Sequence, residues 1–227
     1  DPQRFGRLAE RADFVHLVTE TMKLAYADRE VYYGDPDFAE VPMEHLLSDA
    51  YNAERRKMLG LQASYDLRPG TVPGFEDQRA RALAVIDALG VSDKGVYEPT
   101  MAHLSERRGD TVHIDVIDRW GNMVSSTPSG GWLQSSPIIP GLGFCLNSRA
   151  QMFLLTPGLP TSLEPGKRPR SSMSPTIVMQ DGAPVLAIGS PGGSRIIGYV
   201  AQGIVNYLDF GMNPQQAVAA VENWWDK

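Results

Sequence analysis

The sequence has little that would support a disulfide, a membrane span or a basic binding surface. Its 227 residues include a single cysteine, so no disulfide can form within the chain, and Cys145 is interpreted as a small buried apolar residue. No apolar run approaches the roughly 18 residues of a membrane-spanning helix, so no span is predicted. The net charge of −6 and the lack of a lysine and arginine cluster argue against a nucleic-acid-binding surface.

Sequence patterns for metals and cofactors are missing as well. The histidines show no ligand spacing such as His-x-x-x-His, so neither a metal nor another cofactor is predicted. They are His16, His45, His103 and His113. The chain starts at Asp1 without an initiator methionine, which leaves a leader segment and the choice between periplasm and cytoplasm open.

The composition that is present is that of a soluble globular protein. Apolar residues make up 42% of the chain and charged residues 21%, which is enough for a hydrophobic core under a polar surface. The length allows one large domain or two small ones.

The first half of the chain is predicted to be mainly helical. Residues 13–28 form an amphipathic pattern, and further helices are predicted over 48–61 and over 75–89, where Gly90 ends the helix. The apolar face of the first helix consists of Phe14, Leu17, Val18, Leu24 and Ala25. Residues 92–108 are polar and show no periodicity, so no regular element is predicted there.

A turn with two carboxylates follows the first helix. The Gly-Asp-Pro stretch at 34–36 is typical of a turn, because a residue before proline is disfavoured in a helix. Asp35 and Asp37 suggest either a cation site or a turn held by local hydrogen bonds, and we favour the turn.

The second half is predicted to begin with a strand. Val112, Ile114 and Val116 alternate with polar residues, which predicts a strand with one face on a core and the other available for polar side chains. The runs 176–179 and 185–188 flank an Asp-Gly turn and predict a hairpin.

Two helices and a loop complete the second half. The stretch 135–144 is dense in proline and glycine, which predicts an irregular surface loop near the start of the strand. A helix is predicted after the glycine-rich stretch 189–195, and another begins at Pro214. The predicted apolar face of the first of these helices consists of Ile197, Val200, Ala201, Ile204 and Leu208.

Thr111 stands at the start of the predicted strand, after a polar run. If the bond between Asp110 and Thr111 were cut, Thr111 would gain an α-amino group with a pKa of about 7.7–8.0 beside its own hydroxyl. Such an amine is a competent general base near neutral pH, so a terminal threonine can act as a nucleophile without a histidine. On this segment alone, an ordinary β-branched strand residue is the simpler interpretation.

Three motifs change that balance. Thr-Val-His at 111–113 opens a hairpin that contains Val-Ile-Asp-x-x-Gly-Asn at 116–122. Lys-Arg-Pro-x-Ser-Ser-Met-Ser-Pro follows at 167–175, and Gly-Ser-Pro-Gly-Gly-Ser-Arg at 189–195. In order and spacing they resemble the γ-glutamyltranspeptidase family of N-terminal-nucleophile hydrolases, over about residues 14–220 and most strongly from Gly109 onward.

The resemblance implies a role for each matching residue. Thr111 is the nucleophile that autocatalytic cleavage frees, and Ser129 lies where the family keeps a hydroxyl that hydrogen-bonds the nucleophile. Ser171 and Ser172 lie where the family binds the substrate carboxylate. The last pair, Gly192 and Gly193, matches the oxyanion-hole glycines. A glycine-rich turn at a helix N-terminus, as at that pair, directs backbone N–H groups toward an anion.

The chain departs from the family at three substrate-binding positions. Where other members hold the γ-glutamyl amino and carboxylate groups with an asparagine, a glutamine and an aspartate, it has Gly131, Arg149 and Met152. Loss of the acid removes the partner of a substrate ammonium group, while arginine offers a planar fork suited to a carboxylate. Arg149 is thus either a substrate-carboxylate ligand or a structural ion-pair residue, and the two interpretations are given equal weight.

The resemblance also implies an architecture and an activity. The expected fold is the α+β class, an αββα sandwich of which this chain is an incomplete part, with residues 1–110 ending the large subunit and 111–227 belonging to the small subunit. The expected activity is acyl transfer from γ-glutamyl amides such as glutathione to water or an amine. The alternatives are an amidase for another carboxylated acyl group and an uncleaved binding or assembly module. Expected partners are the small-molecule amide and the chain's own second subunit, with a homo-oligomer also possible because exposed sheet edges self-associate.

Overall fold

The computed structural model describes residues 12–88, 111–129, 137–192 and 195–225. Contacts divide the described chain into two compact units. The helical unit comprises the described residues of Ala12–Arg107 and Ala150–Arg170, and the strand unit comprises those of Arg108–Arg149 and Ser171–Lys227. The predicted division at residue 110 refers to a cleavage point, and it stays a prediction.

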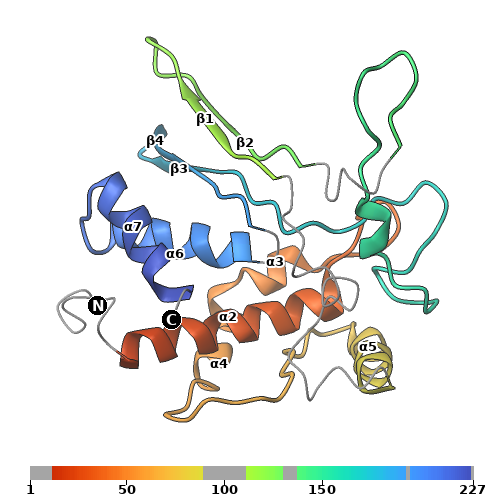
Figure 1. The fold of residues 1–227 in the computed structure, drawn as a ribbon. Helices are drawn as coiled ribbons and strands as arrows, with labels where there is room; N and C mark the ends of the chain where they lie inside the picture. The colour runs from red at the N-terminus through yellow and green to blue at the C-terminus, as the bar shows by residue number, and fades with distance from the viewer. Residues whose placement is uncertain (1–11, 89–110, 130–136, 193–194, 226–227) are drawn as a thin grey trace. The chain divides into compact units, whose positions relative to one another are not determined.

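The helical unit contains the three helices expected in the first half of the chain and one short helix, α3 (Met43–Leu46), that was not predicted (Figure 1). The three expected helices are α2 (Ala12–Tyr32), α4 (Asp49–Arg56) and α5 (Glu76–Ala88). The hydroxyl of Ser48 caps α4 by accepting a hydrogen bond from the backbone N–H of Tyr51 at 3.2 Å. The prediction that this helix reaches residue 61 was wrong, because the N–H groups of Met58 and Leu59 bond only three residues back and end it.

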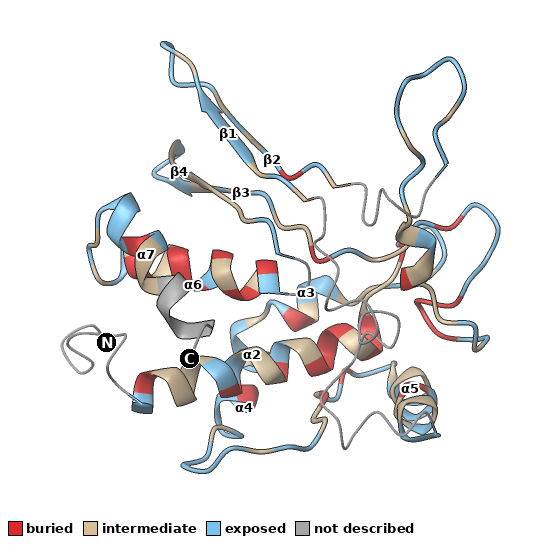
Figure 2. Cartoon of the chain, viewed as in Figure 1, coloured by how far each residue is buried: buried red, intermediate tan, exposed pale blue. Residues whose placement is uncertain are grey.

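One buried cluster holds the helical unit together (Figure 2). Its members come from α2, α3, α4, α5, the loop before α5 and the later segment 150–170, and they are Val31, Tyr32, Leu46, Tyr51, Val72, Ala82 and Leu159. The hydroxyl of Tyr32 satisfies its hydrogen-bonding capacity by donating to the carbonyl of Gly70 at 2.7 Å. Segment 150–170 is therefore part of this core although it lies far away in the sequence.

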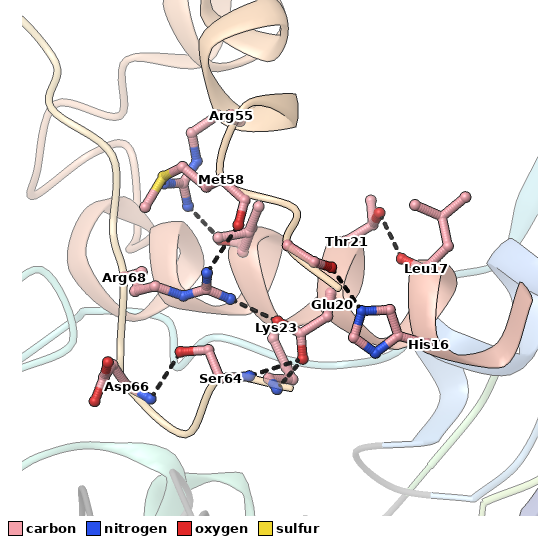
Figure 3. Close-up of polar contacts among 12 residues, drawn as sticks. His16, Leu17, Glu20, Thr21, Lys23, Arg55, Met58, Ser64, Asp66 and Arg68 are labelled. Carbon is pink, nitrogen blue, oxygen red and sulfur yellow. Dashed lines mark hydrogen bonds and ion pairs between the residues drawn. The ribbon is translucent and has the colours of Figure 1, made fainter. Parts of the chain in front are cut away.

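The buried face of α2 carries charges that the amphipathic pattern did not predict. Glu20, Asp28 and Arg29 are buried, whereas Ala25, which was expected on the apolar face, is exposed. Figure 3 shows Glu20 accepting hydrogen bonds from the Arg68 guanidinium at 2.7 Å and the Ser64 N–H at 3.3 Å. Burial alone would raise the pKa of Glu20, but these bonds and the neighbouring Lys23 ammonium group lower it. The charges are tolerated there because each is paired.

The carboxylates after α2 form a turn and an ion pair. The Asp37 N–H donates to Asp35 Oδ1 at 3.2 Å, as the turn interpretation expected. The Arg168 guanidinium donates to Asp35 at 2.6 Å and to Asp37 at 2.7 Å, so an arginine engages both acids. The hydrogen bonds from Arg168 hold the pKa of the buried Asp35 carboxyl well below its usual range.

The strand unit consists of two hairpins and two helices (Figure 1). Strands β1 (Ile114–Ile117) and β2 (Met123–Ser126) form one hairpin, and β3 (Thr176–Gln180) and β4 (Ala183–Ile188) form the other. Strand β2 lies beside β3 and β4, and helix α6 (Ile196–Leu208) packs on β4 and on α7 (Pro214–Trp225). The predicted Asp-Gly turn joins β3 to β4, with Asp181 at φ 51° and Gly182 at φ 79°.

The predicted core face of the first strand was wrong for this chain. Val112, Ile114 and Val116 are exposed to 52%, 52% and 53%, so the described residues do not bury that face of the hairpin in a core. The period-two pattern correctly assigns apolar and polar side chains to opposite faces of the hairpin. It does not show which other parts of the fold cover each face.

The predicted apolar face of α6 was partly wrong. Ala201 and Leu208 are exposed, while Gln202, Gly203 and Asn206 are buried. The reason is close packing: a Cβ at Gly203 would lie 2.6 Å from Ile188 Cδ1, so the glycine side of α6 faces β4. The buried Asn206 amide donates to the Ala217 carbonyl of α7 at 3.1 Å.

Other expectations have mixed outcomes. Residues 92–108 and the start of the loop 135–144 lie outside the described residues, and the rest of that loop is irregular apart from a bridge between Ile138 and Cys145. Cys145 is half-buried rather than buried. Within the described ranges, no helix is long and apolar enough to cross a membrane.

We expect Asp35→Asn to lower the thermal midpoint of the protein by several degrees at pH 7, because Arg168 then loses the buried one of its two charged acceptors. The folded pKa of Asp35 lies below its unfolded value of about 3.9, so its contribution is complete above that pH and declines as the pH falls below it. Thermal melts at pH 7, 5 and 3 check this. The midpoint difference from wild type should be equal at pH 7 and 5 and smaller at pH 3, and a difference that grows on acidification would contradict the assignment.

Candidate active site

The register of the first hairpin determines which side chains meet. Strand β1 pairs antiparallel with β2 so that Asp115 lies opposite Ser125, and an isolated bridge between Thr111 and Ser129 continues the same register. Alternate residues of a strand point to the same face, so the polar side chains gather on one face of the hairpin. They are Thr111, His113 and Asp115 on one side and Ser125, Thr127 and Ser129 on the other.

The turn between the strands fixes this register. The carboxylate of Asp118 accepts hydrogen bonds from the backbone N–H groups of Trp120 and Asn122 and from the Asn122 amide, at 2.8, 2.9 and 2.7 Å. These bonds, led by the one from the Asn122 side chain, lower the pKa of Asp118. Gly121 takes φ 85°, a left-handed conformation that glycine adopts without strain. The tight turn predicted from the sequence is thus confirmed.

Thr111 and Ser129 meet at the open end of the hairpin. Their hydroxyl oxygens are 2.8 Å apart, and either can donate the hydrogen. The Val112 N–H donates to the Pro128 carbonyl at 3.1 Å and holds the two strands together beside them. The two hydroxyls are therefore within hydrogen-bonding distance, and the roles that the resemblance implies for them stay predictions.

Arg149 joins this pair. Its Nη2 donates to Ser129 Oγ at 2.7 Å and lies 3.9 Å from Met173 Sδ. In the described part of the chain, Arg149 makes no ion pair with a carboxylate, so the structural ion-pair interpretation has no support there. The guanidinium is instead engaged with the hydroxyl that contacts Thr111.

The serine motif reaches the site through Met173. Ser172 is buried and Ser171 is exposed, and the Ser171 hydroxyl accepts a hydrogen bond from the Met173 N–H at 3.1 Å. The Met173 sulfur contacts Arg149, so Met173 belongs to the site. Ser172 and Ser171 precede it in the sequence by one and two residues.

Several predicted site residues cannot be placed beside Thr111. Asp110, Gly131 and Gly193 lie outside the described residues. Gly192 lies in the loop between β4 and α6 at φ 131°, and Met152 is buried and belongs to the helical unit. The oxyanion hole and the cleavage point therefore stay predictions.

His113 is a neighbour whose partners the sequence analysis missed. Its Nδ1 is 2.8 Å from Thr127 Oγ1 and its Nε2 is 2.9 Å from Asp115 Oδ2. The ring also lies against the backbone of Gly189, where a Cβ would come within 2.2 Å of His113 Cε1. Gly189, the first residue of the glycine-rich motif, therefore lies next to His113, which is two residues after Thr111. Counting pairs outward from the turn at Asp118 would have identified Thr127 from sequence alone.

Comparisons with known proteins bear on this arrangement. The family model for gamma-glutamyltranspeptidase matches residues 4–226. The glutathione hydrolase proenzyme of Bacillus subtilis (strain 168) is 38% identical over 203 residues, which cover 89% of this chain and 32% of that protein. The structure of LmbA2991T421A is 46% identical with a TM-score of 0.74, over 91% of this chain and 34% of that one. The cephalosporin acylase from Bacillus halodurans has a TM-score of 0.69 at 30% identity, over 93% of this chain and 32% of that one.

These likenesses confirm the predicted α+β fold, that of the N-terminal-nucleophile hydrolases. The chain spans about a third of the length of the proteins it matches.

We expect Gly189→Ala to reduce the free energy of unfolding by about 1–3 kcal/mol, because the new methyl group would overlap the His113 ring. The same substitution in a His113→Ala background should cost less than about 1 kcal/mol, since the obstructing ring is gone. Urea denaturation of the four proteins measures the cycle. An equal cost in both backgrounds would show that the ring is not what restricts residue 189.

Proposed function

Because the chain belongs to the γ-glutamyltranspeptidase family, we propose that it forms the catalytic part of an acyl-transfer enzyme whose nucleophile is Thr111. Cleavage of the bond between Asp110 and Thr111 frees the α-amino group of the threonine. The observation that carries this proposal is the 2.8 Å contact between Thr111 Oγ1 and Ser129 Oγ at the end of the hairpin.

The residues support a two-step reaction. The neutral α-amine takes the proton of the Thr111 hydroxyl while its oxygen attacks the carbonyl carbon of an amide donor. The amine of the donor leaves with that proton, and an ester on Thr111 remains. Water or an acceptor amine then attacks the ester, which releases a carboxylic acid or a new amide and restores the hydroxyl. Backbone N–H groups of Gly192 and Gly193 stabilise the oxyanion in both steps; losing one such donor typically costs about 2.7–4 kcal/mol.

The core of the helical unit supports a stable pair of subunits after cleavage. Residues before the cut and residues after it share the same core, since Leu159 packs with Val31 and Tyr32. Arg168 also donates to Asp35 across the future cut. Each half therefore keeps the other as a non-covalent partner.

The favoured acyl donors are γ-glutamyl amides such as glutathione. The support is the family and the serine motif: Ser171 and Ser172 would bind the donor carboxylate. Similarity to a glutathione hydrolase proenzyme points the same way.

A specific observation favours a second donor class, a carboxylated acyl group without the amine. Met152 stands where the resemblance expects an acid, so the partner of a substrate ammonium group is missing at that position. The chain is also similar to a cephalosporin acylase. A third candidate, an uncleaved binding or assembly module, would require an intact bond before Thr111.

We expect the full-length wild-type protein to yield a species that begins at Thr111, and Thr111→Ala to remain uncut, because the variant has no attacking oxygen. Intact mass over time measures this, with circular dichroism to confirm that both proteins are folded. If both stay uncut while folded, the enzyme proposal fails and a binding or assembly role replaces it.

For the donor, we expect the cleaved enzyme to hydrolyse both γ-glutamyl-4-nitroanilide and glutaryl-4-nitroanilide, which differ only in the α-amino group. The γ-glutamyl donor should be preferred by less than about tenfold in kcat/KM, because Met152 stands where an acid would pair with the ammonium group. Release of nitroaniline measures both rates. A preference for the glutaryl donor would instead support the acylase alternative.

A further inference from the structure

Arg149 extends the hydroxyl pair into a chain of three groups. It is the first residue of the short 3₁₀ helix η3 (Arg149–Met152), and its Nη2 donates to Ser129 Oγ at 2.7 Å. The same oxygen lies 2.8 Å from Thr111 Oγ1. A permanent cation therefore stands two hydrogen bonds from the oxygen proposed as the nucleophile.

The hydrogen bond between Arg149 and Ser129 has a fixed direction, from Arg149 to Ser129. Arginine has only donors, so Ser129 must accept from it. The Ser129 hydroxyl can donate its own hydrogen to Thr111 Oγ1 once that oxygen gives up its proton. Hydrogen bonds with a charged partner are about twice as strong as neutral ones, so the guanidinium holds Ser129 more firmly than a neutral amide would.

The guanidinium has five N–H donors, and its contact with Ser129 uses one of them. Its Nη2 is engaged with Ser129, and its Nε is buried without a hydrogen-bond partner. A bidentate carboxylate needs two neighbouring donors that it can reach. The contact that the structure shows is with Ser129, so the geometry favours a role toward Ser129, and experiment separates that role from carboxylate binding.

We propose that Arg149 is a positioning residue that orients Thr111 through Ser129, both in autocatalytic cleavage and in turnover. This inference rests on the proposed function. It differs from carboxylate binding in one measurable way: cleavage of the chain involves no substrate, so a carboxylate ligand would not affect its rate, whereas a residue that positions Thr111 would.

The experiment measures the rate of cleavage before Thr111 by intact mass in the full-length protein. We expect Arg149→Gln, which keeps an N–H donor but removes the charge, to slow cleavage about ten- to a hundredfold. Arg149→Lys, which keeps the charge, should recover part of that loss. In turnover of γ-glutamyl-4-nitroanilide, kcat should fall by a similar factor while KM stays within about twofold.

Two controls make the assignment specific. Arg119→Gln removes the same charge from the exposed turn of the first hairpin, where the guanidinium lies 5.1 Å from the Trp120 ring, and cleavage should keep the wild-type rate. In a Ser129→Ala background, Arg149→Gln should have little further effect, because the side chain through which Arg149 acts is gone. Thermal midpoints of all variants identify reductions in cleavage rate that are caused by unfolding. If Arg149→Gln does not fold, the cleavage rate of Arg149→Lys tests the proposal instead.

The outcomes separate this inference from the proposed function. A wild-type protein that is folded and never cut overturns both. A wild-type protein that is cut, together with Arg149→Gln cut at the same rate but with raised KM, leaves the function intact and overturns the positioning role. Additive effects of Arg149→Gln and Ser129→Ala would also overturn it.

Discussion

The register of the β1–β2 hairpin is the constraint on which the candidate site depends. Thr111 and Ser129 are separated by the whole hairpin, yet their hydroxyls meet because every pair between them and the turn is in step. A slip by one residue would give Thr111 another partner and turn its side chain to the opposite face. The Asp118 carboxylate, with its three hydrogen bonds inside the turn, supplies the local energy that opposes such a slip. The chemistry of the site is thus fixed partly at its distant end.

Sequence reasoning succeeded where a feature is determined by its nearest neighbours. The start of α4 follows from the Ser48 hydroxyl, and the β3–β4 turn follows from Asp181 and Gly182, which adopt positive φ values. In each case a few adjacent residues carry enough information to select one conformation. The contact between Thr111 and Ser129 was expected only from the family resemblance, and the roles of the two residues stay predictions.

Features that depend on distant partners could not be predicted in this way. Nothing near Glu20 in the sequence indicates that it would be buried, since the Arg68 guanidinium that makes burial tolerable comes from another loop. The bond from Arg149 to Ser129 depends on where a later loop returns to the hairpin. The exposure of Val112 likewise depends on what else covers the sheet, which a period-two pattern does not describe.

The contact between Gly189 and His113 has a consequence for how the two positions can evolve. Any side chain at residue 189 would occupy the space of the imidazole ring, so glycine is required there for steric reasons that are separate from catalysis. A relative that loses the histidine loses that restriction, and a relative that gains a larger residue at 189 must first lose the ring. The two positions should therefore vary together across related sequences, and an unchanging glycine at 189 would not by itself identify an oxyanion donor.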